Sequence, residues 1–374
     1  MLTALHTDRT GRIVVAADYG AAAQAGGPAR AFAEGIPLPP RARVVPLPDR
    51  DALGMDRHGR PRSLGAGRWA VGAILGPGHL RTQLPACTGR DDAAPLEPQG
   101  YAAVAAGADG ALIVAAVPTG EGPAPVAPTE VALAAAITAG LRAHPSSAAL
   151  RQLARRAREH EDAGTSALFL HQGDGPLPVS GDRITAADLA DLAIAHLAAG
   201  GTGVTFGLAG DPDPLTRPRV VADAASRIRE AIPSARIAVR TNAAAAAAIA
   251  RVAEAGVDRL VIPLASARPE TYERLHPARV SRWPDVRSGF RQAVACGLPV
   301  TIELLVLPGL TDRAEEADAL VALLRELPSG SAVRLRDLVA DPYVLLRANP
   351  GSEPLGIEVL LARLRTEASA VSAA

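Results

Sequence analysis

The polar residues best placed for chemistry share one feature, since each lies at or near the carboxyl end of an expected strand. They are Gly207, Asp211, Asp213, Asn242, Ser266, Glu303 and Arg336. Carboxyl ends of parallel strands meet at one edge of a sheet, where folds of this kind bind their ligands. We therefore expect these residues to line a single cofactor- or ligand-binding site.

Two carboxylates of this set follow each other closely in a loop rich in Gly and Pro. Asp211 and Asp213 are spaced for a paired metal site or an acid–base pair. The alternative is a solvated turn in which neither carboxylate has a chemical role. The sequence leaves both interpretations open.

Glu303 and Arg336 are the charged residues with the strongest need of a partner. Glu303 lies in an otherwise apolar strand, where an unpaired buried carboxylate is costly, so we expect an ion pair with Arg240 or Arg336. The alternative is a polar pocket for a ligand amine or sugar. Arg336 is suited to clamp a carboxylate or phosphate through two hydrogen bonds, or else to pair with Asp337 or Asp341.

Composition excludes several other kinds of site. The 39 basic residues are all arginines, which removes a Schiff-base lysine and a P-loop lysine. The two cysteines, Cys87 and Cys296, are too few for a disulfide framework or a four-thiolate metal site. No two histidines have the spacing of a helical metal site. With 39 acidic residues balancing the basic ones, nothing favours a nucleic-acid or anionic-membrane partner.

Periodicity predicts four segments. Residues 1–128 read as a mostly β N-terminal domain with a Pro/Gly-rich linker, 129–161 as a helical connector (129–143 and 146–161), 162–345 as alternating strands and helices, and 346–374 as a helical tail. Strands are expected at 176–180, 202–207, 236–242, 259–265, 299–307 and 331–338. Helices are expected near 185–199, 217–231, 243–255, 284–295 and 313–326, with Asn242 as an N-cap and Gly256 and Gly297 as helix ends.

Alternation of strand and helix indicates parallel strands with right-handed crossovers. Six such units favour an α/β fold with a partial (β/α)6, TIM-like barrel, preceded by the small mostly β domain. A doubly wound open sheet produces the same periodicity, so the pattern does not separate the two. The N-terminus lacks the apolar stretch of a signal peptide, and no apolar run reaches the length of a membrane span, so we expect a cytoplasmic location.

Several motifs, in this order, resemble the radical SAM superfamily. Residues 236–275 contain a strand ending in T-N, a helix ending A-G-V-D-R and a strand ending S-x-x-P-E-x-Y, and residues 298–312 read LPVTIELLVLPGLTD. The L-R-D-L run at 335–338 and the D-P-Y of 341–343 resemble one subgroup of that family. GPGHLRTQLPA (76–86) and LEPQGYAAV (96–104) resemble the N-terminal extension of the same subgroup.

The resemblance implies a [4Fe–4S] cluster held by C-x3-C-x2-C after the first strand, but these cysteines are absent. The sequence at this place is PLPVSGDRITAADL, which we expect to pass from strand to helix through a turn of a few residues. A cluster needs thiolate ligands, so we expect no [4Fe–4S] cluster. Pro212-Asp213-Pro214 stands where the family has a G-E-P-like contact to SAM, which weakens that contact. Ala243 replaces the glycine of the family's T-N-G.

These departures lead us to expect a cluster-free relative of radical SAM enzymes without radical chemistry. It would act as a scaffold or regulatory partner of an active paralogue or biosynthetic enzyme, with residual binding of a SAM-like small molecule at the barrel mouth. One alternative is a non-radical enzyme that uses carboxylates and arginine at the strand ends. The other is a decayed paralogue that folds but has no function.

Overall fold

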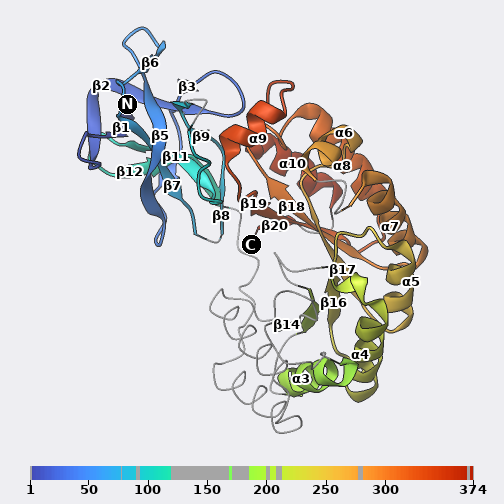
Figure 1. Ribbon diagram of the computed structural model, residues 1–374. Helices are drawn as coiled ribbons and strands as arrows, with labels where there is room; N and C mark the ends of the chain where they lie inside the picture. Colours follow the sequence, from blue (N-terminus) through green and yellow to red (C-terminus); the bar gives the residue numbers. More distant parts are fainter. Residues whose placement is uncertain are drawn as a thin grey trace.

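The computed structural model describes residues 2–76, 78–89, 93–118, 168–170, 185–198, 203–207, 213–276, 281–368 and 371–373. They form an N-terminal β unit that ends at Pro118 and an α/β unit that begins at Leu168 (Figure 1). The linker expected after Pro118, the helical connector and Asp211 lie outside the described residues. Within the described ranges, no helix is long and apolar enough to cross a membrane.

The N-terminal unit consists of short antiparallel strands, in agreement with the mostly β region expected. The strands are β1 (Thr3–Thr7), β2 (Ile13–Gln24), β3 (Arg30–Ala31), β4 (Ile36–Pro37), β5 (Arg43–Met55), β6 (Pro61–Ser63), β7 (Trp69–Ile74), β8 (His79–Arg81), β9 (Leu84–Pro85), β10 (Cys87–Gly89), β11 (Tyr101–Ala106), β12 (Leu112–Val114) and β13 (Ala116–Pro118). Most belong to one sheet with the main path β10-β5-β2-β1-β7-β11-β12-β4, while β8 pairs with β13. At the turn between β1 and β2, the Asp8 carboxylate accepts hydrogen bonds from the N–H groups of Thr10 and Arg12.

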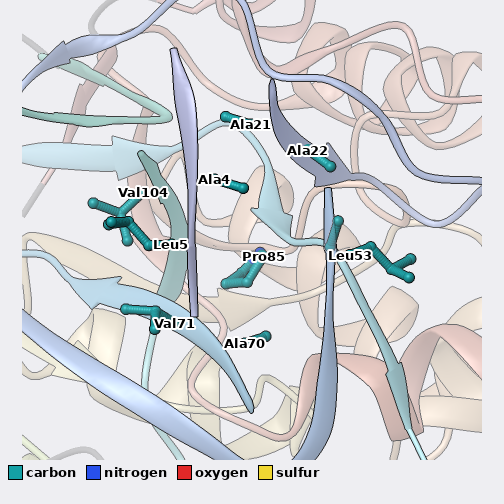
Figure 2. A pocket seen from close by; sticks show the side chains of 10 residues that line it. Ala4, Leu5, Ala21, Ala22, Leu53, Ala70, Val71, Pro85 and Val104 are labelled. Carbon is teal, nitrogen blue, oxygen red and sulfur yellow. The ribbon is translucent and has the colours of Figure 1, made fainter. Parts of the chain in front are cut away.

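Apolar side chains fill the interior of the N-terminal unit. A cavity of about 10 Å³ remains there, lined by residues of several strands that include Leu5, Val71 and Val104 (Figure 2). A space of this size holds about one water molecule. This interior is therefore packed core, and sites for larger ligands must lie elsewhere.

The α/β unit is built on a parallel sheet whose strands lie side by side in chain order. They are β14 (Leu168–Leu170), β15 (Val204–Phe206), β16 (Ile237–Arg240), β17 (Arg259–Leu264), β18 (Val300–Val306), β19 (Ala332–Asp337) and β20 (Val371–Ala373). Every neighbouring pair is parallel. The five strands expected between residues 202 and 338 are confirmed.

The two ends of this sheet add to what we expected. Among the described residues the sheet begins with Leu168–Leu170, a strand that we did not expect. The expected strand at 176–180 lies outside the described residues and stays a prediction. At the other end, the tail expected to be helical contains a helix at 357–367 and closes with a short strand, in which Val371 pairs with Val333.

Most helices pack against one face of the sheet. They are α3 (Ala186–Ala198), α4 (Pro218–Ala231), α5 (Ala246–Glu254), α6 (Pro269–Leu275), α7 (Trp283–Ala295), α8 (Ala314–Glu326) and α10 (Ile357–Glu367), with a 3-10 turn η1 (Pro214–Thr216). Helix α9 (Pro342–Ala348) lies instead beyond the strand ends, where its leucines pack with Leu307 and Leu310. Alternate strand residues such as Val239, Ile262 and Leu304 join the helices in the main apolar core. In the part of the chain that is described, the helices other than α9 line one side of the sheet (Figure 1). The residues between these core positions face the other way.

Helix ends follow the expected signals in two places and depart from them in a third. Gly256 and Gly297 follow α5 and α7 with positive φ angles of 92° and 64°, as helix-ending glycines do. Asn242 is not an N-cap, because α5 begins only at Ala246. Its Oδ1 instead accepts a hydrogen bond from the Ala244 N–H, in a local turn after β16.

The N-terminal unit docks at the carboxyl ends of β18 and β19. Leu84 packs with Leu307 and Leu310, which follow β18. The Tyr343 hydroxyl of α9 donates to the Pro85 carbonyl at 2.8 Å. We call this contact region, together with the ion pairs described below, the seam.

Candidate functional site

Gly207 and Asp213 hold the ends of β15 and β16 together. Gly207 has φ 96°, and a Cβ there would lie 2.5 Å from the Arg240 carbonyl oxygen. The Asp213 carboxylate accepts hydrogen bonds from the Thr241 hydroxyl, the Asn242 N–H and the Leu215 N–H at 2.7–3.0 Å. Both carboxylate oxygens are thus occupied by the protein's own donors. Asp211 lies outside the described residues, so its pairing with Asp213 stays a prediction.

Ser266 belongs to a different cluster from the other expected site residues. Its hydroxyl donates to Glu316 of α8, which also accepts a hydrogen bond from the Thr271 hydroxyl at 2.6 Å. Ser266, Thr271 and Glu316 are all at least 96% buried. This network joins the end of β17 to α6 and α8. Glu316 was missed from the sequence because an acid early in a helix also fits a helix-dipole role.

Glu303 lies at the centre of a group of arginines. The Arg240 Nε donates to one carboxylate oxygen at 2.9 Å, and nitrogens of Arg336 and Arg334 lie 3.5 and 3.6 Å from the other. The side chain of Glu303 is 3% exposed. The expected ion pair with Arg240 or Arg336 is therefore present with both, and Arg334 is a third partner that we did not foresee.

The partners that we considered for Arg336 as alternatives are engaged elsewhere. Asp337 lies 3.3 Å from the Arg81 Nε, and Asp341 accepts a hydrogen bond from Arg50 at 2.8 Å. Both arginines come from the N-terminal unit, so these two ion pairs form part of the seam. Because Asp337 and Asp341 pair with these arginines, the carboxylate that remains for Arg336 among those we considered is Glu303.

The sheet face opposite the helices carries an excess of positive charge, and we call it the arginine face. In its described part, Arg240, Arg334 and Arg336 lie around the carboxylate of Glu303, and Arg259 lies nearer the amino-terminal end of β17, where it donates to the Thr301 hydroxyl. Side chains of Arg334 and Arg336 remain 42% exposed. Burial, and then the charge of Arg334, lower the pKa of the Arg259 guanidinium. An anion bound on this face would relieve that repulsion and find two guanidiniums open to it.

The cysteines do not fit the iron–sulfur cluster that the resemblance implies. Cys87 is buried in β10 of the N-terminal unit, where burial raises the pKa of its thiol to about 11. Cys296 is exposed at the end of α7, which leads into the amino-terminal end of β18. Neither sulfur lies at the carboxyl ends of β14–β16, and three thiolates are needed. In the described ranges, no three His, Cys, Asp or Glu residues are grouped to hold a metal ion.

Comparison with known proteins supports the family indicated by the motifs. The sequence profile described as the radical SAM superfamily matches residues 140–321. No curated protein sequence matches the chain.

Solved structures resemble the chain only distantly. A radical SAM methyltransferase from Sphaerobacter thermophilus is 21% identical, with a TM-score of 0.37, over 51% of this chain and 57% of that chain. Methylornithine synthase (PylB) is 16% identical, with a TM-score of 0.36, over 66% of this chain and 82% of that one. A domain of pyruvate-formate lyase-activating enzyme from Bacteroides vulgatus ATCC 8482 is 17% identical, with a TM-score of 0.35, over 46% and 99%. The match thus spans less than two thirds of the methyltransferase.

The family profile ends within α8 and includes the motifs at 236–275 and 298–312, whereas the segments that resemble one subgroup, at 76–86, 96–104, 335–338 and 341–343, lie outside it. Over residues 140–321, just under half of its length, the chain therefore contains a radical SAM superfamily domain.

Proposed function

We propose that this chain is a cluster-free radical SAM protein that binds a small anionic molecule on its arginine face and performs no radical chemistry. The observation that carries the proposal is the set of guanidiniums around Glu303, with Arg334 and Arg336 still 42% exposed. Of the described carboxylates, Glu303 alone forms ion pairs with Arg240, Arg334 and Arg336, so these three guanidiniums exceed the negative charge beside them. The ligand class is a carboxylate or a phosphate, because guanidinium groups bind both with paired hydrogen bonds.

The proposal includes a partial (β/α) barrel whose interior is the arginine face. Helices on one side of a parallel sheet support it, since a doubly wound sheet carries helices on both sides. In such a barrel the free face lines a central pocket that opens at the carboxyl ends of the strands. Docking of the N-terminal unit at β18 and β19 would then cover one side of that opening.

SAM itself is a net cation, but it is one candidate ligand because the carboxylate of its methionine part could pair with the guanidiniums. Asp213, at the position of the family's G-E-P-like contact, has both oxygens engaged by Thr241, Asn242 and Leu215. Recognition of SAM would therefore depend on its carboxylate and the arginine face. The same hydrogen bonds leave Asp213 poorly placed as a general base, which weighs against the non-radical enzyme.

The anion proposal is tested by titrating the protein with SAM and, separately, with inorganic phosphate by calorimetry. We expect at least one to bind, and Arg336→Ala to weaken its binding about tenfold, the loss of one charge-assisted hydrogen bond. Arg334→Ala/Arg336→Ala should weaken it further. Arg291→Ala on exposed α7 is the matched control and should leave affinity unchanged. Equal weakening by all three variants, or no binding of either probe, would contradict the proposal.

The cluster-free state is tested by anaerobic reconstitution with iron and sulfide. We expect no absorbance in the thiolate-to-iron charge-transfer region, because the chain supplies two distant thiols. A radical SAM enzyme with an intact C-x3-C-x2-C motif, treated in parallel, serves as the positive control. Uptake of about four irons per chain together with cleavage of SAM would overturn this part of the proposal.

A protein that binds a ligand without transforming it acts through other proteins. We therefore extend the proposal to a regulatory or scaffold role beside an active paralogue or a biosynthetic enzyme. Two observations support this extension. The two distant cysteines speak against radical chemistry, and the hydrogen-bonded carboxylate of Asp213 speaks against acid–base chemistry, so ligand binding is the role that we propose for the site.

A further inference from the structure

A larger cavity lies between the two units and shares no lining residue with the arginine face. Its volume is about 600 Å³. One wall is the β2–β3 segment from Ala23 to Glu34, with Thr82 and Gln83 beside it. The other wall is formed by Asp312, by residues 351–356 between α9 and α10, and by Glu358 in the first turn of α10. A space of this size accommodates a small organic molecule.

Direct backbone contact fixes the two walls against each other. A Cβ at Gly26 would lie 2.7 Å from the Gly309 carbonyl oxygen, and one at Gly309 would lie 2.4 Å from the Ala25 carbonyl carbon. Both glycines also have positive φ angles, 71° and 86°. Such an approach requires glycine on both sides. The cavity is therefore a constant feature of the docked units.

The lining of this cavity is acidic. Glu34, Asp312, Glu353 and Glu358 contribute carboxylates, and Arg30 is the cation among its lining residues that are described. Arg30 forms an ion pair with Glu353, and both side chains are well exposed (63% and 65%). That pair therefore lies at the outer rim, which leaves three carboxylates without a cation from the lining.

Asp312 is the deepest of these acids and lacks a donor for one oxygen. Its residue is 0% exposed, and Oδ1 accepts a hydrogen bond from the Gly309 N–H at 2.7 Å. Oδ2 meets no donor in the part of the chain that the structure describes. Burial raises the pKa of Asp312 to about 6, Glu358 also raises it, and Arg313 opposes the shift. A buried carboxylate with an unpaired oxygen destabilises the folded protein unless a cation or a hydrogen-bond donor contacts that oxygen.

We propose that the interunit cavity binds a small organic cation with an amine group, which Asp312 and Glu358 receive. An amine supplies both what Oδ2 lacks, a hydrogen-bond donor, and the positive charge that the lining lacks. A bare metal ion fits less well, since no three metal-ligand side chains are grouped in the described ranges and the cavity is far larger than an ion. This site is separate from the anion site of the arginine face.

The probe is putrescine, titrated into the full chain by calorimetry at pH 8, with 1,4-butanediol as its uncharged analogue of equal length. We expect putrescine to bind and butanediol not to bind. Asp312→Asn and Glu358→Gln should each weaken putrescine binding tenfold or more. Glu254→Gln, which removes the same charge from exposed α5, is the matched control and should bind like the parent.

A second variant tests the site in the opposite direction. Arg30→Ala removes the cation at the rim, so it should tighten putrescine binding several-fold. The thermal unfolding midpoint of Asp312→Asn at pH 8 should be at or above that of the parent, because the substitution removes a buried charge. Absence of putrescine binding to the parent, equal affinity for butanediol, or unchanged affinity in both Asp312→Asn and Arg30→Ala would overturn the proposal.

Discussion

Replacing Gly289 by alanine is expected to lower the free energy of unfolding by about 3 kcal/mol or more, the upper range for overpacked cores. A Cβ at this position of α7 would lie 1.8 Å from the Ala243 carbonyl oxygen and 2.8 Å from its carbonyl carbon. The obstacle is backbone, so no side-chain rotation relieves it. Urea unfolding followed by circular dichroism measures the effect.

Ala243 has little freedom to move away from α7. It holds a left-handed φ of 62°, which is strained for a residue with a Cβ, and its N–H donates to the Thr241 hydroxyl. Thr241 in turn donates to Asp213. The control is Gly20→Ala in β2, whose nearest new contact is 3.6 Å and which should change stability little. A Gly289→Ala protein as stable as this control would show that α7 can shift.

The second large effect is expected at the seam, where Asp341→Ala should cost about 3–5 kcal/mol, the loss found when a buried ion pair loses one partner. The Asp341 Oδ2 accepts hydrogen bonds from Arg50 and from the Leu96 N–H, both at 2.8 Å. The side chains of Arg50 and Asp341 are 4% and 5% exposed. Without Asp341, the acceptors left to the buried guanidinium among the described residues are the carbonyl oxygens of Pro48 and Ala94. The free energy of unfolding from urea titration checks this.

A double-mutant cycle separates the pair from other losses at the seam. The combined Arg50→Ala/Asp341→Ala variant should lose clearly less than the sum of the single losses, because the second substitution removes an already unpaired group. The surface pair of Arg325 and Glu367 is the reference, and Glu367→Ala should lower the free energy of unfolding far less than Asp341→Ala, because water screens an exposed pair. Strict additivity of the two seam substitutions would contradict the pairing.

The parallel sheet was predictable because the strands from β15 to β19 are apolar or alternate apolar with polar residues, and helix signals separate them. Strand β14 was not foreseen, because three residues are too few for a periodic pattern. Strand β20 has three residues in an Ala-rich tail, a length at which pairing with β19 decides the conformation. The register of these strands depended on tertiary contacts that periodicity does not contain.

The candidate site was predictable where strand geometry decides it. Glu303 and Arg336 lie on adjacent strands at the same edge, so the rule for strand ends brought them together. Asp213 and Ser266 were expected to face a ligand, but they form hydrogen bonds with Thr241 and Glu316. The spacing of these residues in the sequence does not predict such bonds. The seam was not foreseen, because Arg50 and Asp341 are separated by 291 positions.

The arginine–aspartate pairs buried between the two units link the evolution of the two units as well as their folding. A fragment that begins after Pro118 would present Asp337, Asp341, Leu307 and Leu310 to water without Arg81, Arg50 and Leu84. Recombination that exchanged one unit for that of a distant homologue would leave mismatched charges at the join. The two units are therefore expected to be inherited together, with substitutions on one side of the seam matched by substitutions on the other.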